Sequence, residues 1–347
     1  MDNTNLEINL SKINDISIID VKTLYFNPDA IQESGIKLHR LDHKSHRNYF
    51  TVTKENRLDK IYTSVTTFAK SVMPTSAGLI MWMKNKTPEE QEAILKSSST
   101  YGTLMDILFN KMLISGKIDD IGKEVFQFTM KERLYNINLD QWIEQLKRDC
   151  LAFAQFVEDY EVKPILVSCP LKSDNIMIAG TLDLLCEMND KIPTKTDIKK
   201  GVRPNRINAI IDYKAKIGDM TLKSDRNSFY DSECLQLQLY KKLYYDSFND
   251  DRYIQGLYNF SPKNWRTSPD YNLKSWLNTK TANDMSAKFD SFLNIFKIDS
   301  MGEEKSITVI DDSISLDGFK EQFRSVLLTD FINKTLEEAE NDKQASI

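Results

Sequence analysis

The hydrophobic period of the chain changes abruptly around Pro164, and no other feature limits its possible folds as strongly. Before this point, apolar residues recur at three- and four-residue steps from Leu146 to Tyr160, which predicts a helix over about 140–161. After it come short apolar runs typical of buried strands, at 165–167, at 175–186 with an interruption at Gly180, and at 209–213. A helical pattern at 231–247 and a strand at 253–258 follow. The series predicts an α/β fold with a mixed central sheet flanked by helices.

Further elements are predicted on both sides of this core. Upstream, a hairpin is expected from 47–52 through a polar turn to 60–62, and Thr63 or Ser64 caps a helix that starts near Val65 and ends at Pro74. Other helical patterns lie at 76–85, 87–96, 100–115, 273–297 and 315–339. We divide the chain into an N-terminal preface (1–63), a core with its upstream helices (64–265), a C-terminal helical extension (266–340) and a disordered tail (341–347).

Cysteine and histidine spacing argues against the common structural metal sites. The four cysteines show no C-x-x-C spacing, so we expect buried thiols and neither a disulfide framework nor an iron–sulfur cluster; they are Cys150, Cys169, Cys186 and Cys234. The three histidines, His39, His43 and His46, have spacings that fit a zinc trio on a helix. The dense charges around them favour a solvated loop instead.

Hydropathy and charge indicate where such a protein works. No apolar run approaches the ~18 residues needed to cross a bilayer. The polar start of the sequence has no secretory signal pattern, so we expect a cytoplasmic protein without membrane contact. The net charge of −5 argues against a protein that coats nucleic acid through bulk charge. Any basic contact surface must therefore be local.

Two carboxylates stand at the ends of neighbouring apolar strands. Asp183 follows Gly180-Thr181-Leu182, and Asp212 follows Ile210-Ile211. A charge inside so apolar a run is costly to bury unless it is paired or bound to a metal. Lys214 lies two residues after Asp212, so both side chains project to the same face of the strand. A simple ion pair accounts for this D-x-K spacing as readily as a catalytic role does.

The next helix adds a third polar group. Gln236 and Tyr240 are four residues apart and share one helical face, while Leu235, Leu239 and Leu243 form the apolar stripe beside it. Standing alone, this pair fits a polar flank of a half-buried helix equally well. It gains meaning from its position directly after the two carboxylate-bearing strands.

Taken together, these motifs resemble the RecB-like branch of the PD-(D/E)XK nucleases, especially the phage exonuclease-like members. The family's G-x-x-D, D/E-x-K and Q-x-x-x-Y are matched by Gly180–Asp183, 212–214 and 236–240, over about 140–260 of the chain. A weaker match is Gly102-Thr103, followed by Asp106 where relatives carry a metal-binding histidine. The 167–169 segment lacks the acid that relatives carry before G-x-x-D. The resemblance implies a restriction-endonuclease-like core with helical additions at both ends.

The resemblance also implies a mechanism. Asp183, Asp212, the backbone carbonyl of Tyr213 and Asp106 would hold Mg²⁺, or Mn²⁺, for which carboxylate oxygens are suitable ligands. Lys214 would position water or stabilise developing negative charge, and two groups would orient it, Gln236 and Tyr240. The expected function is a metal-dependent DNA nuclease, an exonuclease of phage-type recombination, replication or DNA end processing, which could work with a recombination or replication partner protein.

Two alternatives remain open. The substitution at Asp106 also fits a catalytically inactive member that serves as a DNA-binding or assembly module. An unrelated α/β protein whose D-x-K motif is only an ion pair is the other. Nothing in the sequence distinguishes DNA from RNA, and no G-x-x-x-x-G-K-[ST] phosphate-binding loop of a helicase is present.

A local basic cluster lies between the second and third predicted strands. It faces only Asp197 and consists of Lys191, Lys195, Lys199, Lys200, Arg203 and Arg206. Such a loop is either a solvated turn or a phosphate-gripping extension, because cationic contacts supply much of the affinity for DNA. A weaker nucleic-acid signal is Trp265, which lies between Lys263 and Arg266 and could stack on a base.

Overall fold

A mixed, largely antiparallel sheet organises the protein, whose structure is a computed structural model. The structure describes residues 19–20 and 31–302, apart from 33, 44–45, 55–57, 75–76, 133, 135–136, 217–228, 249, 251 and 266. The sheet has eight strands in the order β10-β9-β8-β7-β4-β3-β2, with β6 paired to β7 off this path. They are β2 (His39–His43), β3 (His46–Val52), β4 (Leu58–Ser64), β6 (Lys163–Ser173), β7 (Ile178–Asn189), β8 (Arg206–Tyr213), β9 (Gly256–Pro262) and β10 (Tyr271–Ser275). A small separate sheet pairs β1 (Ile19–Asp20) with β5 (Lys117–Ile118).

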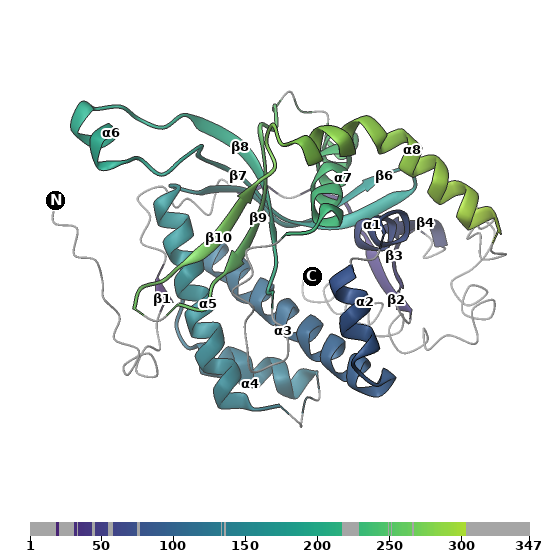
Figure 1. The fold of residues 1–347 in the computed structure, drawn as a ribbon, viewed down its shortest axis with the longest axis horizontal. Coiled ribbons are helices and arrows are strands. Elements are labelled where there is room, and N and C mark those ends of the chain that lie inside the picture. The colour runs from purple at the N-terminus through teal and green to yellow at the C-terminus, as the bar shows by residue number, and fades with distance from the viewer. Residues whose placement is uncertain are drawn as a thin grey trace.

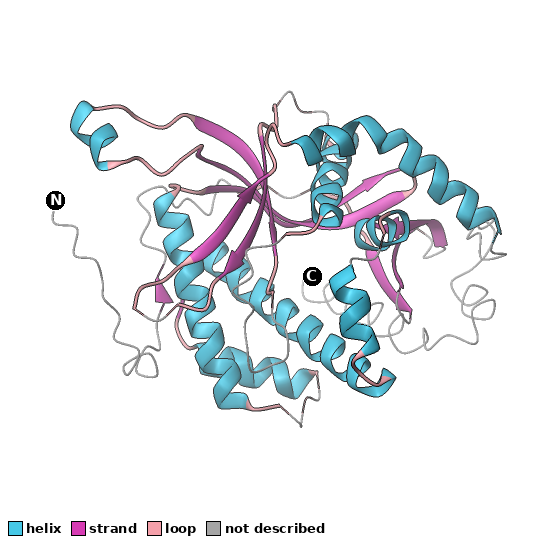
Figure 2. Cartoon of the chain, viewed as in Figure 1, coloured by secondary structure: helices cyan, strands magenta, loops and turns pink. Residues whose placement is uncertain are grey.

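Helices cover both faces of this sheet (Figures 1 and 2). They are α1 (Val65–Val72), α2 (Ala77–Lys84), α3 (Pro88–Ser115), α4 (Ile121–Lys131), α5 (Leu139–Asp159), α6 (Lys195–Lys200), α7 (Asp231–Ser247) and α8 (Lys280–Gly302). On one face, α3, α4 and α5 bury an aromatic cluster in which Phe109 stacks on Phe153 with ring centroids 4.1 Å apart. On the other face, α1, α7 and α8 pack over a second cluster that includes Leu182, Leu185 and Ile210. The sheet is therefore the middle layer of three.

The central strand β7 changes its neighbour partway along one edge. β6 pairs with it antiparallel over nearly its whole length. On the opposite edge, β4 pairs parallel with Ile178 and Ala179, whereas β8 pairs antiparallel from Leu184 onward. Between these two ladders, residues 180–183 of β7 pair with neither strand. The fold thus leaves one short stretch of a central strand with an open edge.

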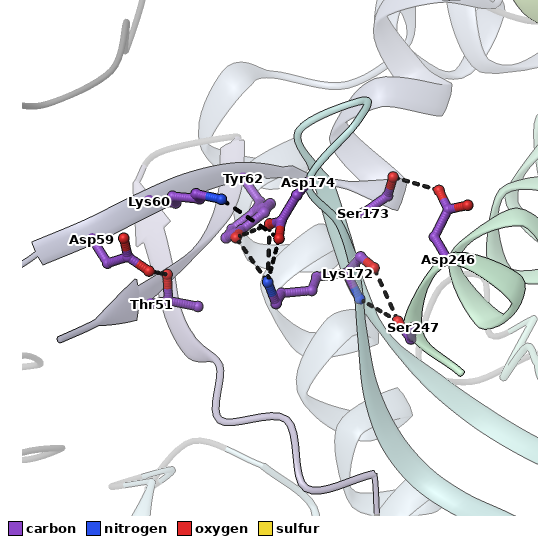
Figure 3. A network of polar contacts seen from close by, with 9 residues as sticks. All are labelled: Thr51, Asp59, Lys60, Tyr62, Lys172, Ser173, Asp174, Asp246 and Ser247. Atoms are coloured by element: carbon purple, nitrogen blue, oxygen red, sulfur yellow. Dashed lines mark hydrogen bonds and ion pairs between the residues drawn. The ribbon is translucent and has the colours of Figure 1, made fainter. Parts of the chain in front are cut away.

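Polar contacts fasten the N-terminal hairpin to the rest of the sheet (Figure 3). Tyr62 on β4 donates a hydrogen bond to Asp174, in the turn between β6 and β7, at 2.5 Å. Lys172 contacts both oxygens of the same carboxylate at 2.9 Å. The next residue, Ser173, donates to Asp246 at the end of α7 at 2.5 Å. These bonds fix β4 beside the start of β7 and thereby define where the open edge begins.

The structure confirms the α/β layer with a mixed sheet flanked by helices. The predicted helix at 231–247 matches α7, and α5 begins and ends close to the predicted 140–161. Ser64 caps α1, as predicted, by accepting a bond from the Thr67 N–H at 3.0 Å. All four cysteines are buried free thiols, also as predicted. None of the described helices is both long and apolar enough to span a bilayer.

Several predicted boundaries were wrong. The patterns at 87–96 and 100–115 belong to one helix, α3, because the polar run between them is tolerated on its exposed side. The second strand is not interrupted at Gly180, and residues 174–177 form a turn. The last predicted strand starts later, at Gly256, and the helix expected from 273 starts at Lys280 after β10. Helices α4 and α6 were not predicted. The predicted helix at 315–339 and the tail at 341–347 lie outside the described residues.

Candidate active site

Asp183 lies at the end of the open stretch of β7. Leu182 packs in the cluster under α7, whereas Leu184 packs in the cluster under α3 and α5, so the alternation of faces breaks at Asp183. Opposite it on β6, Ser168 has a positive φ of 47°, a local irregularity of the kind that re-aims side chains. The carboxylate accepts a hydrogen bond from the Tyr213 N–H at 2.8 Å. Asp183 therefore caps the end of β8 with its side chain.

The glycine of the G-x-x-D motif has a steric role. A Cβ at Gly180 would lie 2.9 Å from Cε1 of Tyr240 and 3.0 Å from Cγ2 of Val65. Both distances are shorter than ordinary van der Waals contact, so only glycine lets α7 and α1 approach β7 this closely. Gly180 and Tyr240, two motif members far apart in sequence, are thus parts of one packing contact.

A chain of polar contacts runs from β8 to α7. The Lys214 ammonium lies 2.6 Å from Oδ2 of Asp212 and donates to Oε1 of Gln236 at 3.0 Å. Asn259 on β9 donates to the same Asp212 oxygen at 2.6 Å, and its own carbonyl accepts from the Trp276 indole at 2.7 Å. Asp212 is 4 % exposed and Gln236 6 %. The lysine is therefore held in one position by a buried network.

Asp106 approaches the same point from the other layer. Gly102 lies one helical turn earlier on α3, and a Cβ there would meet Cβ of Ala215, next to Lys214, at 3.9 Å. Burial, followed by the negative charge of Asp183, raises the pKa of Asp106 well above its ordinary value. The charges of Asp183, Lys214 and Asp212 all contribute to this shift, which indicates that Asp106 lies near the acid–lysine site.

The site holds several closely spaced, partly desolvated carboxylates around one cation, the Lys214 ammonium. Burial, together with the charge of Asp212, raises the pKa of Asp183 to about 7. Burial alone would lower the pKa of Lys214, but the charges of Asp212, Glu233 and Asp183 outweigh it and raise that pKa. Lys214 stays charged, whereas the acids bind protons more readily than usual. Removing this repulsion requires either protons or a further cation.

Several residues at the site were missed by the sequence-based prediction. Glu233 is buried on α7, and its Oε1 pairs with the Lys216 ammonium at 2.6 Å. Lys216 also lies 4.8 Å from the Phe229 ring centroid and 4.7 Å from that of Tyr230. Arg47 on β3 is close enough to lower the pKa of both Asp106 and Asp183. The only available signals were a lysine two residues beyond D-x-K and a glutamate three residues before Q-x-x-x-Y.

The donor set fits a hard divalent cation. In the described ranges, no three Asp, Glu, His or Cys side chains form a ready-made coordination cluster. Asp106 nevertheless interacts electrostatically with Asp183 and Asp212, and carboxylates of this kind are the ligands that Mg²⁺ and Mn²⁺ prefer. The predicted ligand Tyr213 contributes its backbone N–H to Asp183, while its ring packs on Phe109 and away from Lys214. Its predicted carbonyl contact stays a prediction.

The predicted basic cluster lies far from the carboxylates. It occupies the tip of the β7–β8 hairpin, which projects from the body as an arm that carries α6 (Figure 1). Arg206, at the base of this tip, is six residues along β8 from Asp212, or roughly 20 Å at the usual rise of an extended strand. Its guanidinium binds Glu187 at 2.9 Å and Asn189 at 3.0 Å. The structure therefore gives Arg206 a role in holding the arm together.

Two further predictions were wrong, the stacking role of Trp265 and the loop expected around the three histidines. Trp265 is 4 % exposed, packs on Ala152 and donates its indole N–H to the Arg148 carbonyl at 3.1 Å, so its ring is not free to stack on a base. Arg266 lies outside the described residues. His39, His43 and His46 belong to strands β2 and β3 and not to a loop or a helix. His39 stacks on Phe50 with centroids 5.0 Å apart.

No known family model matches this chain, and no curated protein matches it either. The residues and geometry of the site itself therefore carry the functional assignment.

Proposed function

We propose that this protein is a divalent-metal-dependent DNA nuclease with a restriction-endonuclease-like core. The observation that carries the proposal is the convergence of Asp106, Asp183 and Asp212 with one fixed lysine, Lys214. These four residues come from α3, β7 and β8, and the lysine is held by Gln236 of α7. An isolated ion pair would need neither the other two acids nor the glutamine.

The chain's own residues divide the work between them. Asp183, Asp212 and Asp106 would hold Mg²⁺ or Mn²⁺, which when bound supplies Lewis-acid chemistry at a phosphodiester and its attacking water. Lys214 keeps its proton and presents a fixed positive charge, suited to the negative charge that develops on the phosphate in the transition state. Gln236 accepts a second hydrogen bond from the lysine and thereby fixes the direction of its ammonium group. Tyr240 maintains the packing of α7 on Gly180.

The alternative of a catalytically inactive binding module is favoured by one observation. Oδ2 of Asp212 already accepts bonds from both Lys214 and Asn259, at 2.6 Å each. In an inactive protein this saturation would be permanent, and the network would serve only to fix the fold. In an active enzyme the other carboxylate oxygen of Asp212 would remain to hold a cation.

Incubation of the purified protein with end-labelled substrates separates the two functions. Single-stranded DNA, duplex DNA and RNA are each offered with Mg²⁺, Mn²⁺ or EDTA, and products are resolved by length. We expect DNA cleavage that depends on the divalent ion, with products that shorten from an end if the enzyme acts in DNA end processing. The matched control is Asp212→Asn, which keeps the shape of the side chain and removes its charge. Equal cleavage by both proteins, or none by either, contradicts the proposal.

A further inference from the structure

The tip of the β7–β8 arm is folded and yet buries nothing. α6 is closed at its start by Thr194, whose side chain accepts from the Asp197 N–H at 3.1 Å, and at its end by Gly201 with φ 67°. No residue of α6 is buried. A helix this short gains too little from its own hydrogen bonds to be maintained by them alone. Its shape is set by caps and not by packing, which leaves every face of the tip open to a ligand.

Apolar side chains occupy this solvent-exposed tip. Ile198 is 64 % exposed, Val202 48 % and Ile192 45 %. They lie among five basic and two acidic residues within 190–205. Asp197 is occupied by the helix cap, and Asp190 binds Asn205 at the neck of the hairpin. The tip therefore combines exposed apolar side chains with an excess of cations, a composition unlike that of an ordinary solvated turn.

Duplex DNA fits this surface better than other ligands do. The excess of cations complements the dense line of phosphates. An isoleucine flanked by lysines matches the apolar wedges by which proteins enter the minor groove and partly unstack one base step. The arm is also long enough to reach DNA that lies well away from the carboxylates, since Arg206 at the base of the tip is already roughly 20 Å along β8 from Asp212. A protein partner would need a larger apolar surface than these side chains supply.

We infer that the β7–β8 arm binds the minor groove of duplex DNA through the cations of its tip and inserts Ile198 between base pairs. This inference rests on the proposed function in taking DNA as the substrate. It adds that the substrate includes a duplex segment, held most of a helical turn from the point of cleavage. The arm is then the element that sets which duplex position faces Asp183 and Asp212.

Binding in the absence of cleavage tests the arm. The full chain is titrated in EDTA with a fluorescent duplex of about 30 base pairs, roughly three helical turns. Ile198→Ser is compared with Ile114→Ser, a control at a similarly exposed position on α3. Burying an isoleucine stabilises a complex enough that we expect Ile198→Ser to weaken binding at least about tenfold. The control should bind like the wild type, and netropsin, a minor-groove ligand, should compete with the wild type.

Salt dependence tests the cations separately. Replacing Lys195, Lys199 and Lys200 by serine should reduce the slope of log affinity against log salt by up to about 3, near 0.9 for each phosphate that is no longer neutralised. The control replaces three exposed lysines elsewhere with serine, namely Lys96, Lys123 and Lys131. Tip variants that bind duplex DNA like the wild type overturn the inference, even if Mg²⁺-dependent cleavage persists. If binding depends on the arm but no cleavage occurs in Mg²⁺, the inference that the arm binds DNA is supported and the proposed nuclease function is contradicted.

Discussion

The acid–lysine site and the tip of the arm present opposite solutions to holding charge. At the site, Asp212 and Lys214 are largely removed from solvent, and each is bonded to further fixed groups. At the tip, Lys199 and Lys200 stand in water on a helix that buries nothing. Specific contacts hold each buried charge in place, so the loss of any one contact should have a large effect. Exposed charges act collectively, so the replacement of any one of them should have a small effect.

The largest effect is expected at the lysine of the buried site. Lys214→Ala should abolish detectable cleavage, a loss of at least about 10²–10³ in rate, because the lysine stabilises charge that develops only in the transition state. DNA affinity, measured in EDTA, should stay near that of the wild type. If Asp212 holds the metal as proposed, Asp212→Ala should be at least as severe, because this change removes a metal ligand as well. A Lys214→Ala protein that cuts at the wild-type rate in Mg²⁺ would leave the site without its chemistry.

Two glycines near the site should respond in opposite directions. Gly180→Ala forces a Cβ to 2.9 Å from the Tyr240 ring and should lower the free energy of unfolding by about 1–3 kcal/mol. Gly102→Ala adds a Cβ at ordinary contact distance within a helix and should be neutral or stabilising by about 0.5–1 kcal/mol. Denaturant titrations of the two variants measure the difference. Equal stability of both variants would show that α7 does not depend on a close approach at Gly180.

The pH dependence of the site follows from Asp183. Its pKa rises on folding from an ordinary 3.8 to about 7, so between these values the folded protein holds a proton that the unfolded chain has released. The stability contributed by this group is therefore full below about pH 4 and falls as the pH rises to about 7. Asp183→Asn should stabilise the metal-free protein at pH 8 by about 1–2 kcal/mol. The carboxamide can still accept from the Tyr213 N–H.

Mg²⁺ should increase the stability of the folded protein over the same pH range in which the ionisation of Asp183 lowers it. Because a proton and a cation compete for Asp183, thermal stabilisation by Mg²⁺ should grow as the pH rises through about 7. The Asp183→Asn variant should lose most of this stabilisation. A Mg²⁺ effect that is equal at pH 5 and pH 8 would show that Asp183 is not a ligand.

The smallest effect on stability is expected at the tip of the arm. Lys199→Ala with Lys200→Ala should change the free energy of unfolding by less than about 0.5 kcal/mol, because neither side chain is buried. It should weaken DNA binding and flatten its salt dependence. Arg206→Ala, at the base of the tip, removes contacts to Glu187 and Asn189 and should destabilise by about 1–2 kcal/mol. Equal stability of the two variants would remove the distinction between the base of the arm and its tip.

Buried elements could be predicted from the sequence more closely than half-buried or exposed ones. Strands and helices with regular apolar spacing, such as α5 and α7, were located closely because burial imposes a period on the chain. Asp183, Asp212 and Lys214 were identified because charge inside an apolar run is unusual. The strand β10 was missed because its residues are only half-buried and show no clear alternation.

Contacts between distant segments could not be predicted. Asn259 and Glu233 are ordinary polar residues in sequence, and only the packing of β9 and α7 beside β8 places them at the site. The same holds for Trp265, whose flanking charges indicated a surface although its ring packs inward on α5. A sequence records the chemistry of a residue, whereas the orientation of its side chain depends on elements that lie elsewhere in the chain.

The change of neighbour along β7 also sets when the acid–lysine site can form during synthesis. The open edge exists only after β4 has paired with Ile178 and β8 with Leu184. Asp212 then needs Asn259, which is held by Trp276 near the end of the described chain. At the ordinary pace of translation, about 5–20 residues per second, the aspartates emerge several seconds before the last of these partners. In the nascent chain these acids are therefore hydrated side chains, and the site forms only once the sheet is complete.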